Sequence, residues 1–150
     1  ILNISGNLQY QSESSAKRLH VSLPDYEIWV RLEPSHLAKL LYQLTENAVC
    51  YTSAKGNIWL SAMQNDEHQT ADFTIKDDGP GISAEDQEFI FNRFYRGQAT
   101  ELVGNPGTGL GLTICKTIVN MYSGTIEVES DLAKGATFIV TLPLAPDMQN

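Results

Sequence analysis

Apolar and polar residues alternate in two stretches near the start of the chain. Residues 19–23 read Leu-His-Val-Ser-Leu and residues 28–32 read Ile-Trp-Val-Arg-Leu, with the turn-forming residues Pro24 and Asp25 between them. Alternation with a period of two is typical of a strand that buries one face. The pattern therefore predicts two strands here. Residues 1–16 are polar with few apolar positions, and we expect them to be a linker or the end of an upstream element.

From Pro34 onward the apolar residues follow a helical spacing instead. They recur three and four residues apart, at Leu37, Leu40, Leu41, Leu44 and Ala48. This spacing predicts a helix with one apolar face that packs on a sheet or another helix, and a polar face that is free for chemistry. A second helical pattern runs from Leu110 to Tyr122 and stops at Gly124, a residue type that is common just past a helix end.

A short third helix is expected after Ser83, because Asp86 lies three residues on, as in a capping box. We expect this helix to carry the aromatic-rich run from Phe89 to Phe94. Because the remaining strands form two hairpins and only three helices separate them, the pattern favours an α+β sandwich over a doubly wound sheet. Those strands are predicted at residues 58–63, 71–75, 125–129 and 136–142, with turns at residues 55–57 and at Gly135.

The composition of the chain limits its possible functions more than it limits its possible folds. The chain has 150 residues, enough for one domain with a core of its own. Its 18 acidic and 10 basic residues give a net charge of −8, which argues against a nucleic-acid partner, since clustered Lys and Arg bind phosphate backbones. Cys50 and Cys115 lie in helical patterns, and we expect free thiols in a reducing cytoplasm.

The sequence also bears on location. No apolar run is long enough to span a membrane and no secretory signal is visible, so we expect a soluble piece without direct membrane contact. The chain begins with Ile1 rather than Met, and we expect it to be excised from a longer protein.

Two glycine-rich stretches carry the clearest chemistry. Asp77-Asp-Gly-Pro-Gly-Ile82 follows an apolar strand, and Gly107-Thr-Gly-Leu-Gly-Leu112 leads into a helix. Glycine lets backbone N–H groups approach a ligand, and a helix N-terminus favours an anion, so the second stretch suits phosphate. The Asp77 carboxylate can accept a hydrogen from an amino group such as that of adenine. Together they predict a nucleotide pocket, although Asp-Gly is also a common hairpin turn.

The glycine spacing excludes or disfavours three familiar ligand motifs. No Lys-Ser or Lys-Thr follows the glycines, as a P-loop requires, and no strand leads directly into them, as in a dinucleotide-binding fold. A calcium loop would need further oxygen ligands and a distal Glu after Asp77.

The polar face of the helix from Pro34 offers a metal ligand. Gln43 and Asn47 lie four residues apart, so both project from the face opposite the leucines. The amide oxygen of Asn47 can bind Mg²⁺, which takes oxygen ligands and keeps waters and phosphates for the rest of its shell. The alternative is an Asn that only caps or solvates the helix.

Five motifs follow one another in a fixed order. They are Asn47-Ala48, Asp77-x-Gly79-x-Gly81-Ile82, Phe91-x-x-Phe94-Tyr95-Arg96, Gly107-Thr-Gly-Leu-Gly-Leu112 and Gly135-x-Thr137. This order resembles that of the sensor histidine kinase catalytic domain, which we place at residues 17–146, with residues 147–150 as a tail. The resemblance implies the Bergerat ATP-binding fold of gyrase, Hsp90 and MutL. That fold is a two-layer α/β sandwich with a mixed sheet, helices on one face, and ATP between the helices and a lid.

The resemblance also assigns the site, with ATP and Mg²⁺ as ligands. It implies that Asp77 binds the adenine amine, that Asn47 is the metal ligand and that Thr137 lies near the adenine. The glycines of residues 107–111 would meet the phosphates, and residues 97–106 would form the lid. The implied ATP-binding set is Asn47, Tyr51, Asp77, Gly79, Gly81, Ile82, Arg96, Gly107, Thr108, Gly109, Leu110, Gly111, Leu112 and Thr137.

Two positions depart from the family pattern. The family often has Asn at the position of Gln43 and a basic residue at the position of Cys50, so the resemblance does not carry the family's phosphate contacts over to these two positions, and weaker ATP binding is an expectation. ATP-hydrolysing relatives carry a Glu four residues before the metal-binding Asn, and Gln43 cannot replace it as a general base. Glu46 points about a hundred degrees round the helix from Asn47. A phosphotransferase is therefore favoured over an ATPase.

The implied function is the ATP-binding catalytic domain of a two-component sensor histidine kinase, which transfers the γ-phosphoryl group of Mg-ATP to a histidine. None of His20, His36 and His68 has the helical context of an acceptor, so we expect the acceptor on a separate dimerisation domain. The expected partners are that domain in a homodimer and a response regulator. The expected location is cytoplasmic, and any membrane anchor of the full-length protein would lie outside these residues. The alternatives are a degenerate nucleotide-binding regulatory module and an ATP-hydrolysing relative. We assign no general base, because positioning and charge neutralisation account for such transfer.

Overall fold

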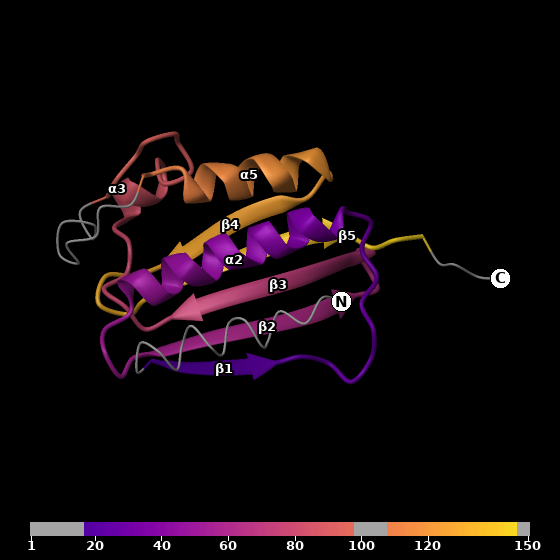
Figure 1. Ribbon diagram of the computed structural model, residues 1–150, viewed down its shortest axis with the longest axis horizontal. Coiled ribbons are helices and arrows are strands. Elements are labelled where there is room, and N and C mark those ends of the chain that lie inside the picture. Colours follow the sequence, from indigo (N-terminus) through magenta and orange to yellow (C-terminus); the bar gives the residue numbers. More distant parts are fainter. Residues whose placement is uncertain (1–16, 98–107, 147–150) are drawn as a thin grey trace.

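A computed structural model describes residues 17–97 and 108–146, and these form a sheet with helices packed on it (Figure 1). The sheet has five strands in the order β1-β2-β3-β5-β4. Three helices are described, namely α2 (Pro34–Tyr51), α3 (Ala84–Gln87) and α5 (Gly111–Met121). The strands are β1 (Arg18–Ser22), β2 (Asn57–Asn65), β3 (Thr70–Asp77), β4 (Thr125–Ser130) and β5 (Ala136–Pro143).

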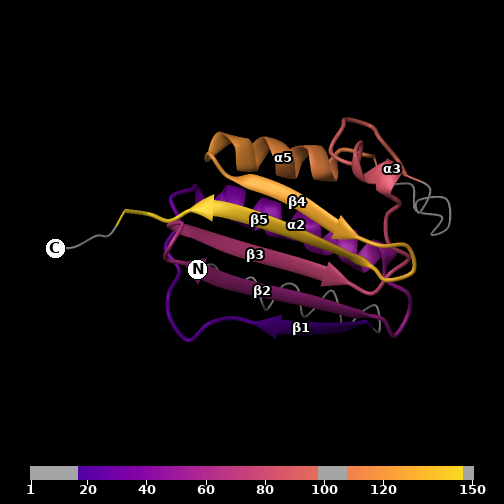
Figure 2. The ribbon, with the colours of Figure 1, turned by 180° about the vertical axis from the view of Figure 1, so that it is seen from behind.

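The sheet is mixed. β1 and β2 are parallel, whereas β2 with β3, β3 with β5 and β4 with β5 are antiparallel. The view from behind shows the strands in front and the long helices behind them, so among the described elements the helices cover one face (Figure 2). The predicted α+β sandwich with its mixed sheet is therefore confirmed.

The core lies between the two layers. The apolar stripe of α2 is buried as predicted, and Leu40 and Leu44 have no exposed surface. Facing residues come from alternate positions of the central strands, among them Ile75 of β3 and Phe138 of β5, each about 1% exposed. Val119 of α5, also fully buried, joins the second helix to the same cluster.

The predicted strand at residues 28–32 is wrong. The burial does alternate, since Ile28 is buried and Trp29 is exposed, but the segment pairs with the sheet only through an isolated bridge between Val30 and Leu144. The chain here crosses the strand ends on its way from β1 to α2 (Figure 1). Residues 28–32 therefore pair with a single residue and do not run alongside a neighbouring strand.

The predicted short helix is confirmed in place but is shorter than expected. Ser83 caps α3 by accepting a hydrogen bond from the Asp86 N–H at 3.1 Å. The helix ends at Gln87, and the aromatic-rich run from Phe89 to Phe94 continues in turns. The other predicted strands and long helices are confirmed within a few residues of their expected ends.

Three elements meet at one end of the sheet. β3 ends at Asp77, α2 ends at Tyr51, and α5 begins at Gly111. The polar face of α2 and the loops that follow β3 are thereby brought together. No helix in the described ranges combines the length and apolar character needed to cross a membrane.

Candidate functional site

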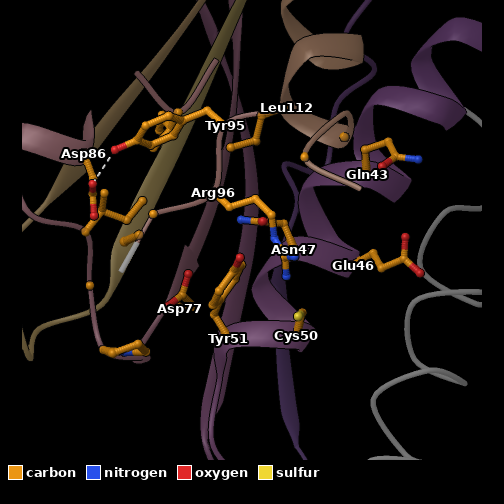
Figure 3. Close-up of a pocket in the computed structure, with 18 of the residues that line it drawn as sticks. Gln43, Glu46, Asn47, Cys50, Tyr51, Asp77, Asp86, Tyr95, Arg96 and Leu112 are labelled. Atoms are coloured by element: carbon orange, nitrogen blue, oxygen red, sulfur yellow. Dashed lines mark hydrogen bonds between the residues drawn. The ribbon is translucent and has the colours of Figure 1, made fainter. Parts of the chain in front are cut away.

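A cavity of about 350 Å³ opens where these elements meet. Its walls come from the second half of α2, the end of β3, the segment around α3 and the start of α5 (Figure 3). These elements are far apart in sequence, so only the folded chain assembles the cavity.

Asp77 supplies a buried carboxylate to this cavity. The residue is 3% exposed, and its Oδ1 accepts a hydrogen bond from the Gly79 N–H at 2.8 Å. Burial raises the pKa of Asp77 above its usual value, because it disfavours the charged form, while the backbone N–H groups of Gly79 and Ala136 partly oppose the shift. The carboxylate is thus held in a fixed orientation at the end of β3.

The turn after Asp77 depends on Gly81. Its φ is +75°, in the left-handed region, and a Cβ there would lie 2.1 Å from the Asp131 carbonyl oxygen. Any other residue would therefore be strained and would collide with backbone. The backbone consequently passes close to residue 131 and leaves Ile82, whose N–H donates to Ser130 Oγ at 2.8 Å, on the cavity wall.

The polar face of α2 forms a second wall. Gln43, Asn47, Cys50 and Tyr51 line the cavity, as the helical spacing predicts. Figure 3 shows Tyr51 beside Asp77, and the side chain of Arg96 extending toward Asn47. An amide and a carboxylate from elements thirty residues apart therefore share one cavity.

Glu46 also borders the cavity but turns away from Asn47 (Figure 3). Its Oε1 accepts a hydrogen bond from the Tyr42 hydroxyl at 3.0 Å, and its side chain is exposed. This carboxylate is therefore not directed at the region between Asn47 and Arg96.

The start of α5 forms a third wall. Thr108, Gly109, Gly111 and Leu112 line the cavity. Among the residues that the structure describes, no side chain caps the helix at its N-cap residue Leu110, whereas Ser83 caps α3. The first N–H groups of an α-helix have no partner within it, so this end is suited to an anion.

The predicted site residues other than Thr137 divide into three groups. Ten line the cavity, namely Asn47, Tyr51, Asp77, Gly81, Ile82, Arg96, Thr108, Gly109, Gly111 and Leu112. Gly79 lies behind Asp77 and Leu110 at the helix start, and neither is part of the lining. Gly107 and the predicted lid residues 98–106 lie outside the described residues.

Thr137 is placed differently from the expectation. Its neighbour Ala136 lines the cavity and is buried, but successive residues of β5 point to opposite faces of the sheet. The Thr137 side chain is therefore directed to the other face. Its predicted position near adenine has no support from this geometry.

Sequence reasoning missed several lining residues, of which Asp86 and Tyr95 are polar. The sequence accounts for Asp86 as part of a helix cap, and for Tyr95 only as part of a family motif. Their contact is a hydrogen bond from the Tyr95 hydroxyl to Asp86 Oδ1 at 2.5 Å (Figure 3). The sequence carries no signal for it, because a turn separates the two residues.

Both cysteines are free thiols, as predicted. Cys115 is fully buried against α2, and burial raises its pKa to about 12, so it stays protonated and inert. Cys50 is half-buried on the cavity wall.

Known proteins resemble this chain in sequence. The sequence profile of one family, described as histidine kinase-, DNA gyrase B- and HSP90-like ATPase, matches residues 32–146. The sensor histidine kinase YclK of Bacillus subtilis (strain 168) is 33% identical over 147 residues, which cover 97% of this chain and 30% of YclK. The chain thus spans less than a third of the length of that relative.

Solved structures are similar as well. The mycobacterial sensor histidine kinase MprB is 25% identical with a TM-score of 0.79, over 96% of this chain and 93% of the MprB chain. Full-length ShkA in complex with AMPPNP has a TM-score of 0.81 at 23% identity, over 96% of this chain and 29% of that one, which supports the fold alone. Since the family profile matches most of its length, the chain belongs to the family of histidine kinase-, DNA gyrase B- and HSP90-like ATPases.

Proposed function

We propose that this chain is the ATP-binding catalytic domain of a two-component sensor histidine kinase. In this proposal it binds Mg-ATP and presents the γ-phosphoryl group to a histidine on another domain. The observation that carries the proposal is the shared cavity of the Asp77 carboxylate, the Asn47 amide and the uncapped N-terminus of α5.

The Asp77 carboxylate fits an adenine amine. A carboxylate offers about four acceptor positions, and the two backbone N–H groups from Gly79 and Ala136 leave capacity for a third donor. Burial makes such a charge-assisted hydrogen bond stronger than it would be in water.

Groups other than Asp77 would bind the triphosphate of ATP. The uncapped N–H groups of α5 favour an anion, and Arg96 adds a positive charge on the facing wall. Residues 17–97 and 108–146 hold no cluster of three or more His, Cys, Asp or Glu side chains that could bind a metal. The amide oxygen of Asn47 suits Mg²⁺, which takes oxygen ligands and binds through few protein ligands together with phosphate oxygens. When bound, Mg²⁺ neutralises charge on the phosphates.

The absence of a directed base favours phosphoryl transfer over hydrolysis. Gln43 stands four residues before Asn47 and cannot accept a proton as a carboxylate would. Glu46 is turned toward Tyr42. The domain would act by holding the nucleotide and its charge in place, so that the acceptor histidine attacks the γ-phosphorus.

The larger protein belongs to the same proposal. Because YclK is about three times as long as the matched region, we expect this chain to function beside a dimerisation and phosphoacceptor domain. A homodimer, a response regulator that receives the phosphoryl group and a cytoplasmic location follow from that setting.

Substitution of Asp77 tests the adenine contact. Asp77→Asn should weaken binding of Mg-ATP by about ten- to a hundredfold, since a hydrogen bond to a charged group contributes about 1.5–3 kcal/mol. It should also reduce discrimination against GTP, because an amide can donate to the guanine oxygen that a carboxylate repels. Calorimetric titration of ATP and GTP measures both effects.

The matched control is Asp72→Asn, the same change on the same strand but with its carboxylate bonded to Thr141 outside the cavity. This variant should bind ATP as the unmodified chain does. Unchanged ATP affinity in a folded Asp77→Asn variant would refute the adenine assignment. If the unmodified chain shows no saturable binding of ATP, a degenerate regulatory module is favoured instead.

A further inference from the structure

The side chain of Asp86 is a buried carboxylate beside the cavity, and the proposed function gives this carboxylate no role. The residue is 7% exposed and lines the cavity. Its backbone N–H completes the cap of α3 through Ser83, which accounts for its main chain but not for its side chain. A carboxylate close to a triphosphate would oppose binding, so it calls for an explanation.

The carboxylate contacts the chain on both sides of Arg96. Oδ1 accepts the hydrogen bond from the Tyr95 hydroxyl at 2.5 Å. A Cβ built on Gly97 would lie 2.9 Å from Oδ2, so the backbone at Gly97 runs against the other oxygen. The pKa of Tyr95 is raised, chiefly by this hydrogen bond, so the hydroxyl stays protonated as a donor.

The backbone just before these contacts is strained. Phe94 has a φ of 64°, which is rare for a bulky residue, and its ring is 65% exposed, so no burial of the ring accounts for the conformation. The Phe94 N–H donates to the Gly109 carbonyl at 3.0 Å. Gly109 has a φ of +70°, and a Cβ there would lie 2.9 Å from Phe94 backbone. The turn is thus fixed against the start of α5.

This turn directs the following side chains. Figure 3 shows Tyr95 reaching Asp86, while Arg96 extends the other way, toward Asn47. Arginine is long and flexible, so a fixed backbone reduces the entropy lost when it binds a ligand. The strained turn and the Asp86 contacts both hold that backbone.

We propose that Asp86 is a positioning residue: through Tyr95 and the backbone at Gly97, it fixes the direction in which Arg96 enters the nucleotide cavity. It thereby sets the affinity for the phosphate part of the nucleotide. This inference rests on the proposed function, since it needs a nucleotide whose phosphates meet Arg96.

Charge alone predicts the opposite result, which makes the test sharp. If Asp86 acted only by repulsion, Asp86→Asn would strengthen binding of the anionic nucleotide. If Asp86 acted only as a structural residue of α3, the variant would lose affinity for ATP and for adenosine by the same factor. Positioning of Arg96 predicts a loss for ATP and no loss for adenosine.

The experiment compares Asp86→Asn, Tyr95→Phe and Arg96→Ala in titrations of Mg-ATP and adenosine followed by NMR, which reports weak binding. Asp86→Asn and Tyr95→Phe should each weaken ATP binding roughly five- to tenfold and leave adenosine binding within about twofold. Combining Asp86→Asn with Arg96→Ala should weaken ATP binding no further than Arg96→Ala alone. Glu85→Gln, the same charge change at an exposed position of α3, is the matched control and should not weaken ATP binding.

Several outcomes would overturn the inference. ATP binding that is unchanged or stronger in Asp86→Asn, equal losses for ATP and adenosine, or additive losses with Arg96→Ala would each do so. Tyr95→Phe keeps the test decisive if Asp86→Asn fails to fold, because it removes the contact without changing a charge. An unmodified chain that does not bind ATP would overturn the proposed function itself, and this inference with it.

Discussion

At the scale of the residue, Asp77 shows a conflict between stability and function. Its carboxylate is buried, and burial raises its pKa, so the ionised form is disfavoured in the folded chain. The hydrogen bonds from Gly79 and Ala136 reduce this cost without removing the shift. A residue kept only for packing would not need this charge. The proposed hydrogen bond to the adenine amine would account for a carboxylate at this position.

The raised pKa of Asp77 predicts opposite pH trends for stability and binding. The folded chain binds the proton more tightly than the unfolded chain, so the contribution of Asp77 to the free energy of unfolding is fully present below about pH 3.8. It is lost as the pH rises through the folded-state pKa. Nucleotide affinity should fall as the pH falls through the same range, because protonation removes the charged acceptor.

Urea unfolding and ATP titration of the unmodified chain and of Asp77→Asn, between about pH 4 and pH 8, would measure both trends. The variant should lose both of them, whereas Asp72→Asn should retain both. Parallel stability curves for the unmodified chain and Asp77→Asn would show that the carboxylate does not titrate as its burial implies.

At the scale of the element, the short helix α3 depends on its cap. It has four residues, and the Ser83 hydroxyl accepts from the Asp86 N–H, so one turn of helix is held largely by one side chain. The same turn carries Asp86 to the cavity wall. Loss of the cap should therefore affect both stability and the site.

We expect Ser83→Ala to lower the free energy of unfolding by about 1 kcal/mol, the usual cost of removing a helix cap. Chemical denaturation would measure this loss. Ser35→Ala is the matched control, because Ser35 is exposed in the first turn of α2, where no side-chain cap is formed. Equal effects of the two substitutions would mean that the Ser83 hydrogen bond contributes nothing.

The elements also show what the sequence can predict. The stripe on α2 and the alternation in β3 follow from burial of one face, which spacing reveals directly. Residues 28–32 alternate in the same way but find no strand edge, because pairing depends on where the chain lies in space. Thr137 was predicted from a motif, although strand alternation assigns the cavity to Ala136. The contact of Asp86 with Tyr95 depends on the left-handed backbone of Phe94, which residue propensities do not predict.

At the scale of the whole molecule, charge opposes the proposed ligand. The chain carries a net charge of −8, and ATP is also an anion, so long-range electrostatics disfavour their association. In the proposed function, three local groups offset this repulsion, namely the N-terminus of α5, Arg96 and a metal ion at Asn47. The proposed contact of Asp77 with adenine is not subject to this repulsion, because adenine is uncharged.

This balance predicts how metal removal and salt act on binding. Chelation of Mg²⁺ should weaken ATP binding about tenfold or more, because the full charge of the triphosphate then meets an acidic protein. Added salt should recover part of that loss, since the repulsion between distant charges is screened beyond about 10 Å at 0.1 M ionic strength. Adenosine binding should respond to neither change.

Asn47→Ala should remove most of the effect of Mg²⁺ on ATP affinity, whereas Asn120→Ala, at an exposed position of α5, should leave that effect intact. If titrations with and without chelator give the same ATP affinity, Asn47 does not support a metal ion.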